Sequence, residues 1–208
     1  MAILKGGVDG PISGLVGTVI CYHMDGVTYM RGKITARAED SWSDKQVIHR
    51  KRVSRVAALW KSLANNPVRS TWRASSKPWP GYSLFLKTNL AAFNADGSQV
   101  DLEYLHLSAG HLPLPHQLQA SGSEGNPEVW KVSWLNDSGK GQASAIDELL
   151  VMTVRDGKFS DPIITGAKRG DKTASIQLPG GEGTVQGIYL SFVSANRESC
   201  SMDQFFGA

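Results

Sequence analysis

Two groups of residues have the composition of a chemical site, and their spacing decides what each can do. Residues 166–173 contain the glycines, lysine and threonine of a phosphate-binding loop, but Asp171 interrupts the Gly-Lys-Thr order and a strand is expected to follow. His106, His111 and His116 recur every five residues, which places them on no common face of a helix or strand. The first group therefore predicts a hairpin turn, and the second predicts no metal site.

The sequence shows no recognisable set of nucleophile, base and acid. Asp147 and Glu148 are adjacent in a segment expected to be a strand, so their side chains point to opposite faces. Cys21 and Cys200 lack a catalytic context, and two cysteines cannot build a disulfide framework. We therefore expect no enzyme, with no catalytic residue, no cofactor and no metal, while a site assembled from distant residues stays open.

A basic cluster on a predicted helix is the remaining candidate for binding. The segment after Ser43, a predicted helix N-cap, places Val56 and Trp60 on one apolar face, so its basic residues spread over the polar remainder. Such a field can bind phosphate, but no motif that reads a nucleic-acid groove accompanies it. A solvent-exposed face or an acidic protein partner is therefore favoured over nucleic acid. The residues assigned to an anionic partner are Arg50, Lys51, Arg52, Arg55 and Lys61.

Charge is unevenly distributed along the 208 residues, whose formal net charge is only +3. Residues 1–80 hold 13 Lys/Arg and 5 Asp/Glu, whereas residues 81–208 hold 9 Lys/Arg and 14 Asp/Glu. Opposite charge favours attraction between neighbouring subunits, although a solvated basic helix would give the same numbers. Hydrophobic residues make up 41% and charged residues 20%, which excludes collagen-like, coiled-coil and wholly disordered chains.

The elements that would position these residues begin with a glycine-rich arm and a β-hairpin. Two β-prone runs, 17–22 and 27–31, flank a hairpin signal of the Asp-Gly type. Because an isolated two-stranded hairpin is only marginally stable in water, it must pack on its own domain or on the next subunit. The residues assigned to this assembly arm and hairpin are Gly10, Gly14, Gly17, Asp25, Gly26, Tyr29 and Arg31.

Helices are expected in the middle of the chain and strands after it. Helical periodicity follows Ser43, a second short helix begins at Pro67, and a third covers 82–93. The class is therefore α+β, with an arm, hairpin and helices in residues 1–93 and an antiparallel β-sandwich in residues 94–208. The expected strands are 100–108, 128–134, 146–154, 173–178 and 186–195.

Three of these expected strands have sequence patterns typical of a known kind of β-sandwich. Residues 132–134, 146–154 and 189–196 have the patterns of the B, C and F strands of a sandwich. With them, the C-terminal half resembles a fibronectin type III or immunoglobulin-like domain.

A series of different short motifs is distributed over nearly the whole chain. They are Gly10-Pro11 with Ser13-Gly14 and Gly17, Asp25-Gly26-Val27 with Tyr29 and Arg31, Lys45-Gln46 with Arg50, Gly81-Tyr82 with Asn89, Gly166-Ala167-Lys168-Arg169, and Tyr189-Leu190-Ser191-Phe192. Through them the chain resembles an uncharacterised family seen in Bacteroidetes genomes. Its N-terminal half is similar to proteins of phage-like structural gene clusters. The resemblance implies lineage and carries no catalytic residue.

These observations lead to one expected function and two alternatives. The first is a self-assembling structural subunit of a virion, tail-like particle or filament. Its partners would be copies of itself, joined through arm or hairpin contacts, and other structural proteins. The second is a non-catalytic module for glycan or protein adhesion, whose ligand aromatics would be Trp79 and Trp130. The third is nucleic-acid packaging through the basic helix.

The sequence gives no sign of export. No apolar run is long enough to span a bilayer, and residues 12–20 lack a cleavage pattern. We therefore expect synthesis in the cytoplasm, no membrane span, and incorporation into a virion or released particle.

Overall fold

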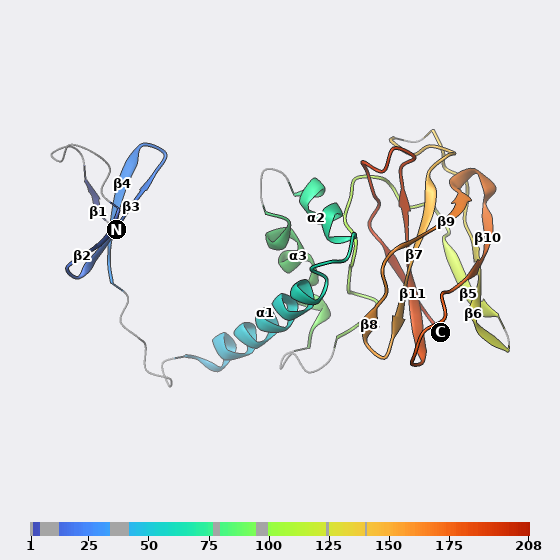
Figure 1. Cartoon of the computed structure of the whole chain (residues 1–208), viewed down its shortest axis with the longest axis horizontal. Helices are drawn as coiled ribbons and strands as arrows, with labels where there is room; N and C mark the ends of the chain where they lie inside the picture. The colour runs from blue at the N-terminus through green and yellow to red at the C-terminus, as the bar shows by residue number, and fades with distance from the viewer. Residues whose placement is uncertain are drawn as a thin grey trace. The chain divides into compact units, whose positions relative to one another are not determined.

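The computed structural model of the chain divides it into two compact units, residues 1–43 and 44–208 (Figure 1). The residues that it describes are 2–4, 13–33, 42–76, 80–94, 100–123, 125–139 and 141–208. The expected α+β class is confirmed, because helices and antiparallel sheets are both present. The two units are described separately.

The first unit is a four-stranded antiparallel sheet, which we call the N-terminal sheet, with strand order β1-β4-β3-β2. Its centre is the predicted hairpin, and the turn residues Asp25 and Gly26 have φ angles of 52° and 77°. Positive φ at both central positions is the geometry of a type I′ turn, which matches the twist of the flanking strands. The strands are β1 (Ala2–Leu4), β2 (Gly14–Val16), β3 (Val19–Met24) and β4 (Val27–Gly32).

The second unit begins with three α-helices. The first starts directly after the predicted N-cap Ser43 and ends before the Asn65-Asn66-Pro67 turn, where the Asn66 side chain accepts a hydrogen bond from the Val68 N–H at 3.0 Å. The third helix is shorter than predicted and continues as a 3₁₀ turn. The bounds are α1 (Asp44–Ser62), α2 (Arg69–Ser75), α3 (Gly81–Asn89) and η2 (Leu90–Ala92).

Two antiparallel sheets follow the helices, a three-stranded sheet of order β10-β6-β5 and a five-stranded sheet of order β12-β11-β7-β8, in which β9 also pairs with β7. The strands of the first are β5 (Gln119–Ser123), β6 (Asn126–Ser133) and β10 (Thr173–Gln177). The strands of the second are β7 (Glu148–Arg155), β8 (Lys158–Phe159), β9 (Ile163–Lys168), β11 (Val185–Val193) and β12 (Gln204–Gly207).

Strands β7 and β11 lie between two hydrophobic clusters. Met152 and Tyr189 pack with the helices, whereas Leu149 and Phe192, on the other face, pack with β6 and β10. Figure 1 shows the helices on one side of this sheet and β5, β6 and β10 on the other. Burial of both faces explains why these two strands are nearly continuous apolar runs instead of alternating ones.

This packing differs from three expectations. Residues 44–93 share a core with the sheet, so the compact units divide after Ser43, whereas the predicted boundary was 93/94. Residues 100–108 form no regular strand. The predicted hairpin turn within 166–173 is instead a crossover through η3 (Arg169–Asp171), because β9 pairs with β7 and β10 pairs with β6.

Candidate functional site

The N-terminal sheet holds most of the residues assigned to assembly. Directly opposite residues of an antiparallel pair project from the same face, so the register defines one face that we call the tyrosine face. Tyr22 and Tyr29 pair across β3 and β4, and their rings stack at 5.4 Å between centroids. The members of the tyrosine face are Leu15, Ile20, Tyr22, Met24, Val27, Tyr29 and Arg31.

Apart from Arg31, the tyrosine face is apolar, and it is accessible. The side chains of Leu15 and Met24 are 58% and 54% exposed, and Cys21, on the opposite face, is the one buried residue of this sheet among those described. Exposed apolar area of this kind marks interaction surfaces.

The glycine-rich segment is not a free arm in its described part. Strands β1 and β2 pair with the hairpin of their own unit, and Gly14 and Gly17 have φ angles of 115° and 60° that favour glycine. Gly10 lies outside the described residues. β1 and β2 are therefore the edge strands of this sheet, so the described part of the glycine-rich segment belongs to the sheet and is not a separate arm.

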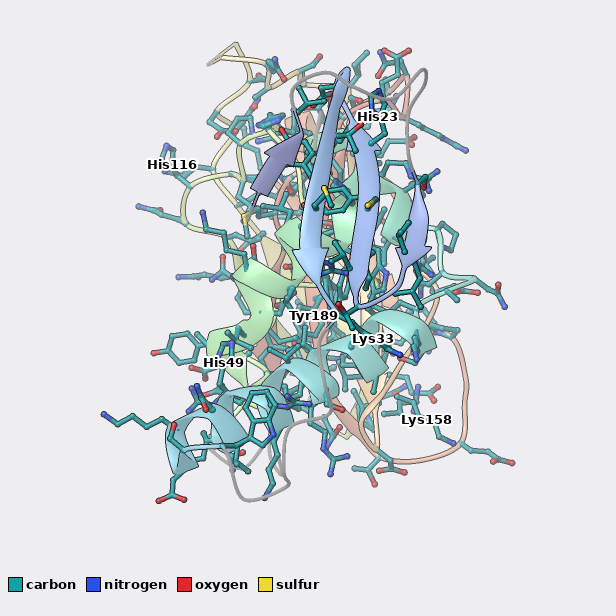
Figure 2. All side chains as sticks on the ribbon, turned by 90° about the vertical axis from the view of Figure 1, so that its left-hand side faces the viewer. His23, Lys33, His49, His116, Lys158 and Tyr189 are labelled. Carbon is teal, nitrogen blue, oxygen red and sulfur yellow. The ribbon has the colours of Figure 1, made fainter. Side chains whose placement is uncertain are left out.

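The basic cluster lies on α1 as predicted, and this helix carries six Lys/Arg against one acidic residue, Asp44. Residues 44–51 are all exposed, and Figure 2 labels His49 among them. Arg52 is half-buried because its Nε–H donates to the Asn94 carbonyl at 2.9 Å. The structure therefore presents Lys51, Arg55 and Lys61 to solvent.

Trp130 cannot serve as a ligand platform in this fold. Its side chain is only 1% exposed, and its Nε1–H donates to the Pro127 carbonyl at 3.1 Å. Alternation along β6 sends this indole into the interior. Trp79, the other aromatic residue assigned to a ligand, lies outside the described residues.

A buried ion cluster forms around Arg169, which the sequence did not reveal as special. Its fully buried guanidinium donates to Asp137 at 2.7 Å, to Asp147 at 3.2 Å and to the Pro113 carbonyl at 2.7 Å. It also lies 4.6 Å from the ring centroid of Phe192. We interpret this cluster as part of the core and not as a reactive site, because its charges are paired and hydrogen-bonded. Removal of one charge would leave the others buried without compensation.

A second polar cluster joins residues 105–109 to the C-terminal segment. One Asp203 oxygen accepts from the N–H groups of Leu107 and Ser108 at 2.7 and 2.9 Å, and the other contacts His106 Nδ1 at 3.0 Å. Asn89 bonds both the N–H and the carbonyl of His106. These hydrogen bonds satisfy backbone N–H and C=O groups of a segment that does not pair with a β-strand.

The electrostatics of this cluster do not assemble a nucleophile. The hydrogen bond with Asp203 raises the pKa of His106, against the opposing effect of burial. Burial raises the pKa of the Cys200 thiol to about 11, so it stays protonated near neutral pH. The Ser108 hydroxyl donates to the Ser201 carbonyl at 3.0 Å and not to His106. The His-Asp pair thus holds the chain together in the described residues, which also contain no group of three or more metal ligands.

Sequence comparison places both units in one family. The model of a family of unknown function, DUF6266, matches residues 11–207. The chain belongs to this family. The DUF6266 match runs from the N-terminal sheet to β12, so the expected full-length resemblance to an uncharacterised family is confirmed. No curated protein and no solved structure matches the chain. Within the described residues, no helix is long and apolar enough to cross a membrane.

Proposed function

We propose that this chain is a non-catalytic structural subunit that assembles with copies of itself, as in a virion, tail-like particle or filament. The observation that carries the proposal is the accessible tyrosine face, on a sheet in which only Cys21 is buried among the described residues. A small sheet needs a covered hydrophobic face for stability. The N-terminal sheet therefore requires a partner surface.

The partner that suits this face best is the same face of a second copy. Two sheets pack about 10 Å apart through apolar inner faces, and a two-fold contact uses one patch twice. Residues 1–43 contain four Lys/Arg and four Asp/Glu, so two such units carry no net charge that would repel. The stacked tyrosines offer the rigid aromatic area that interfaces favour.

We also infer that β5–β12 form an immunoglobulin-like sandwich of the fibronectin type III kind. The order β5-β6-β10 corresponds to strands A, B and E, and β7-β11-β12 to strands C, F and G. Residues 132–134, 146–154 and 189–196, which resembled strands B, C and F, overlap β6, β7 and β11.

The experiment is the oligomeric state of the full chain, measured by size-exclusion chromatography with light scattering over a range of concentrations. We expect the wild type to form oligomers and Leu15→Lys/Met24→Lys to shift toward monomer. The matched control is Leu135→Lys/Ile146→Lys, since these residues are 50% and 54% exposed on the second unit. A monomeric wild type at high concentration, or equal losses in both variants, would contradict the proposal.

A further inference from the structure

A surface hollow of about 860 Å³ lies in the second unit, where the end of α1, the turn before α2, and the start of α3 meet. Its wall combines two arginines with two aromatic rings: Arg69, Arg73, Trp60 and Tyr82. Its volume falls in the range of about 300–1,000 Å³ that suits small-molecule sites. The assembly proposal makes no use of this hollow.

Within the part of the chain that the structure describes, the arginines of the hollow have no acidic partner. No described carboxylate lines the hollow, and neither guanidinium forms an ion pair with a described residue. By contrast, Arg155 pairs with Glu128, and Arg169 contacts two aspartates. Two guanidinium groups without a counter-charge are suited to a bidentate oxyanion.

Packing holds the Arg69 guanidinium and the two aromatic rings in place. The Arg69 Cζ lies 4.3 Å from the centroid of the Trp60 ring, so the guanidinium stacks on the indole. Trp60 in turn lies 6.0 Å from Tyr82 between ring centroids. A Cβ at Gly81 would lie 2.9 Å from the Arg73 backbone nitrogen, so only glycine allows α3 to begin this close to the backbone of α2.

The composition of the wall indicates the chemistry of a ligand. We infer that the hollow binds an organic anion with a planar ring, of about the size of a mononucleotide. Arg69 and Arg73 would hold its oxyanion, and the half-buried ring of Tyr82 would contact its planar part. Asn65, on the same wall, supplies an amide for the polar edge of the ring. The Ser70 hydroxyl donates to the Pro67 carbonyl at 2.7 Å, so its oxygen supplies an acceptor.

Isothermal titration calorimetry of the full chain with AMP tests this inference, with adenosine and inorganic phosphate as separate arms. We expect saturable binding of AMP with an affinity at least about tenfold higher than that for adenosine or for phosphate. The reason is that the free energies of the arginine contacts and of the ring contact add. Equal affinity for phosphate and AMP, equal affinity for adenosine and AMP, or no saturable binding of AMP would overturn the inference.

Substitutions locate the site. Arg73→Gln and Tyr82→Leu should each weaken AMP binding by about tenfold, the loss expected for one charge-assisted hydrogen bond or one ring contact. Lys87→Gln removes a positive charge from an exposed position of α3 outside the hollow and should leave AMP affinity unchanged. Arg73 is exposed, so Arg73→Gln should keep the wild-type circular dichroism. An equal loss in Lys87→Gln, or none in Arg73→Gln, would show that the hollow is not the site.

Discussion

The N-terminal sheet and the β7–β11 pair are both antiparallel, yet their faces have different surroundings. In β11, eight of nine residues are buried, whereas in β3 only one of six is. Helices cover one face of β7 and β11, and the three-stranded sheet covers the other. The central strands β3, β4, β7 and β11 all pair on both sides. The difference therefore lies in the covering of the faces and not in the hydrogen-bonded ladders: covered faces make a core, and an uncovered face stays exposed.

Deletion of residues 1–43 should have the largest effect on assembly and almost none on the second unit. That unit contains both hydrophobic clusters, so residues 44–208 should unfold with a free energy within about 1 kcal/mol of the full chain. Oligomers should disappear entirely. Thermal unfolding followed by circular dichroism, together with light scattering, measures both quantities. An unfolded 44–208 fragment would show that the core of the second unit is not self-sufficient.

Arg169→Met should produce the largest loss of stability within the second unit. It leaves the carboxylates of Asp137 and Asp147 buried without their cation, so we expect a loss of about 3–5 kcal/mol in the free energy of unfolding. Urea denaturation measures it. The exposed Arg197→Met is the control and should change stability by less than about 0.5 kcal/mol. Equal effects from the two variants would mean that the cluster does not stabilise the fold.

The smallest expected effect is a pH dependence from His106. Its pKa is higher in the folded chain than in the unfolded one, so protonation stabilises the fold. The contribution is fully present below the unfolded pKa of about 6.5 and is lost as pH rises through the folded value. Urea midpoints at pH 5.5 and 8.5 should differ more in the wild type than in His106→Gln. An identical difference in both proteins would show that His106 does not contribute.

Local signals predicted the elements whose chemistry lies within a few neighbouring residues. Asp25-Gly26 predicted a hairpin because the turn needs two residues that tolerate positive φ. Ser43 predicted the start of α1, and Asn66-Pro67 its end. Residues 100–108 were predicted as a strand from alternation alone. They form none, because side chains of Asn89 and Asp203 take the bonds that a neighbouring strand would make.

By itself, the sequence determined the hairpin, the helix limits, the α+β class and the basic face of α1, since each depends on spacing within one segment. Only the tertiary structure decided that the helices cover β7 and β11, that Arg169 meets carboxylates 32 and 22 residues away, and that Arg69, Arg73 and Tyr82 line one hollow. The physical reason is that burial and charge pairing depend on which segments the fold brings together. A pattern within one segment does not specify its contacts with segments far away in the sequence.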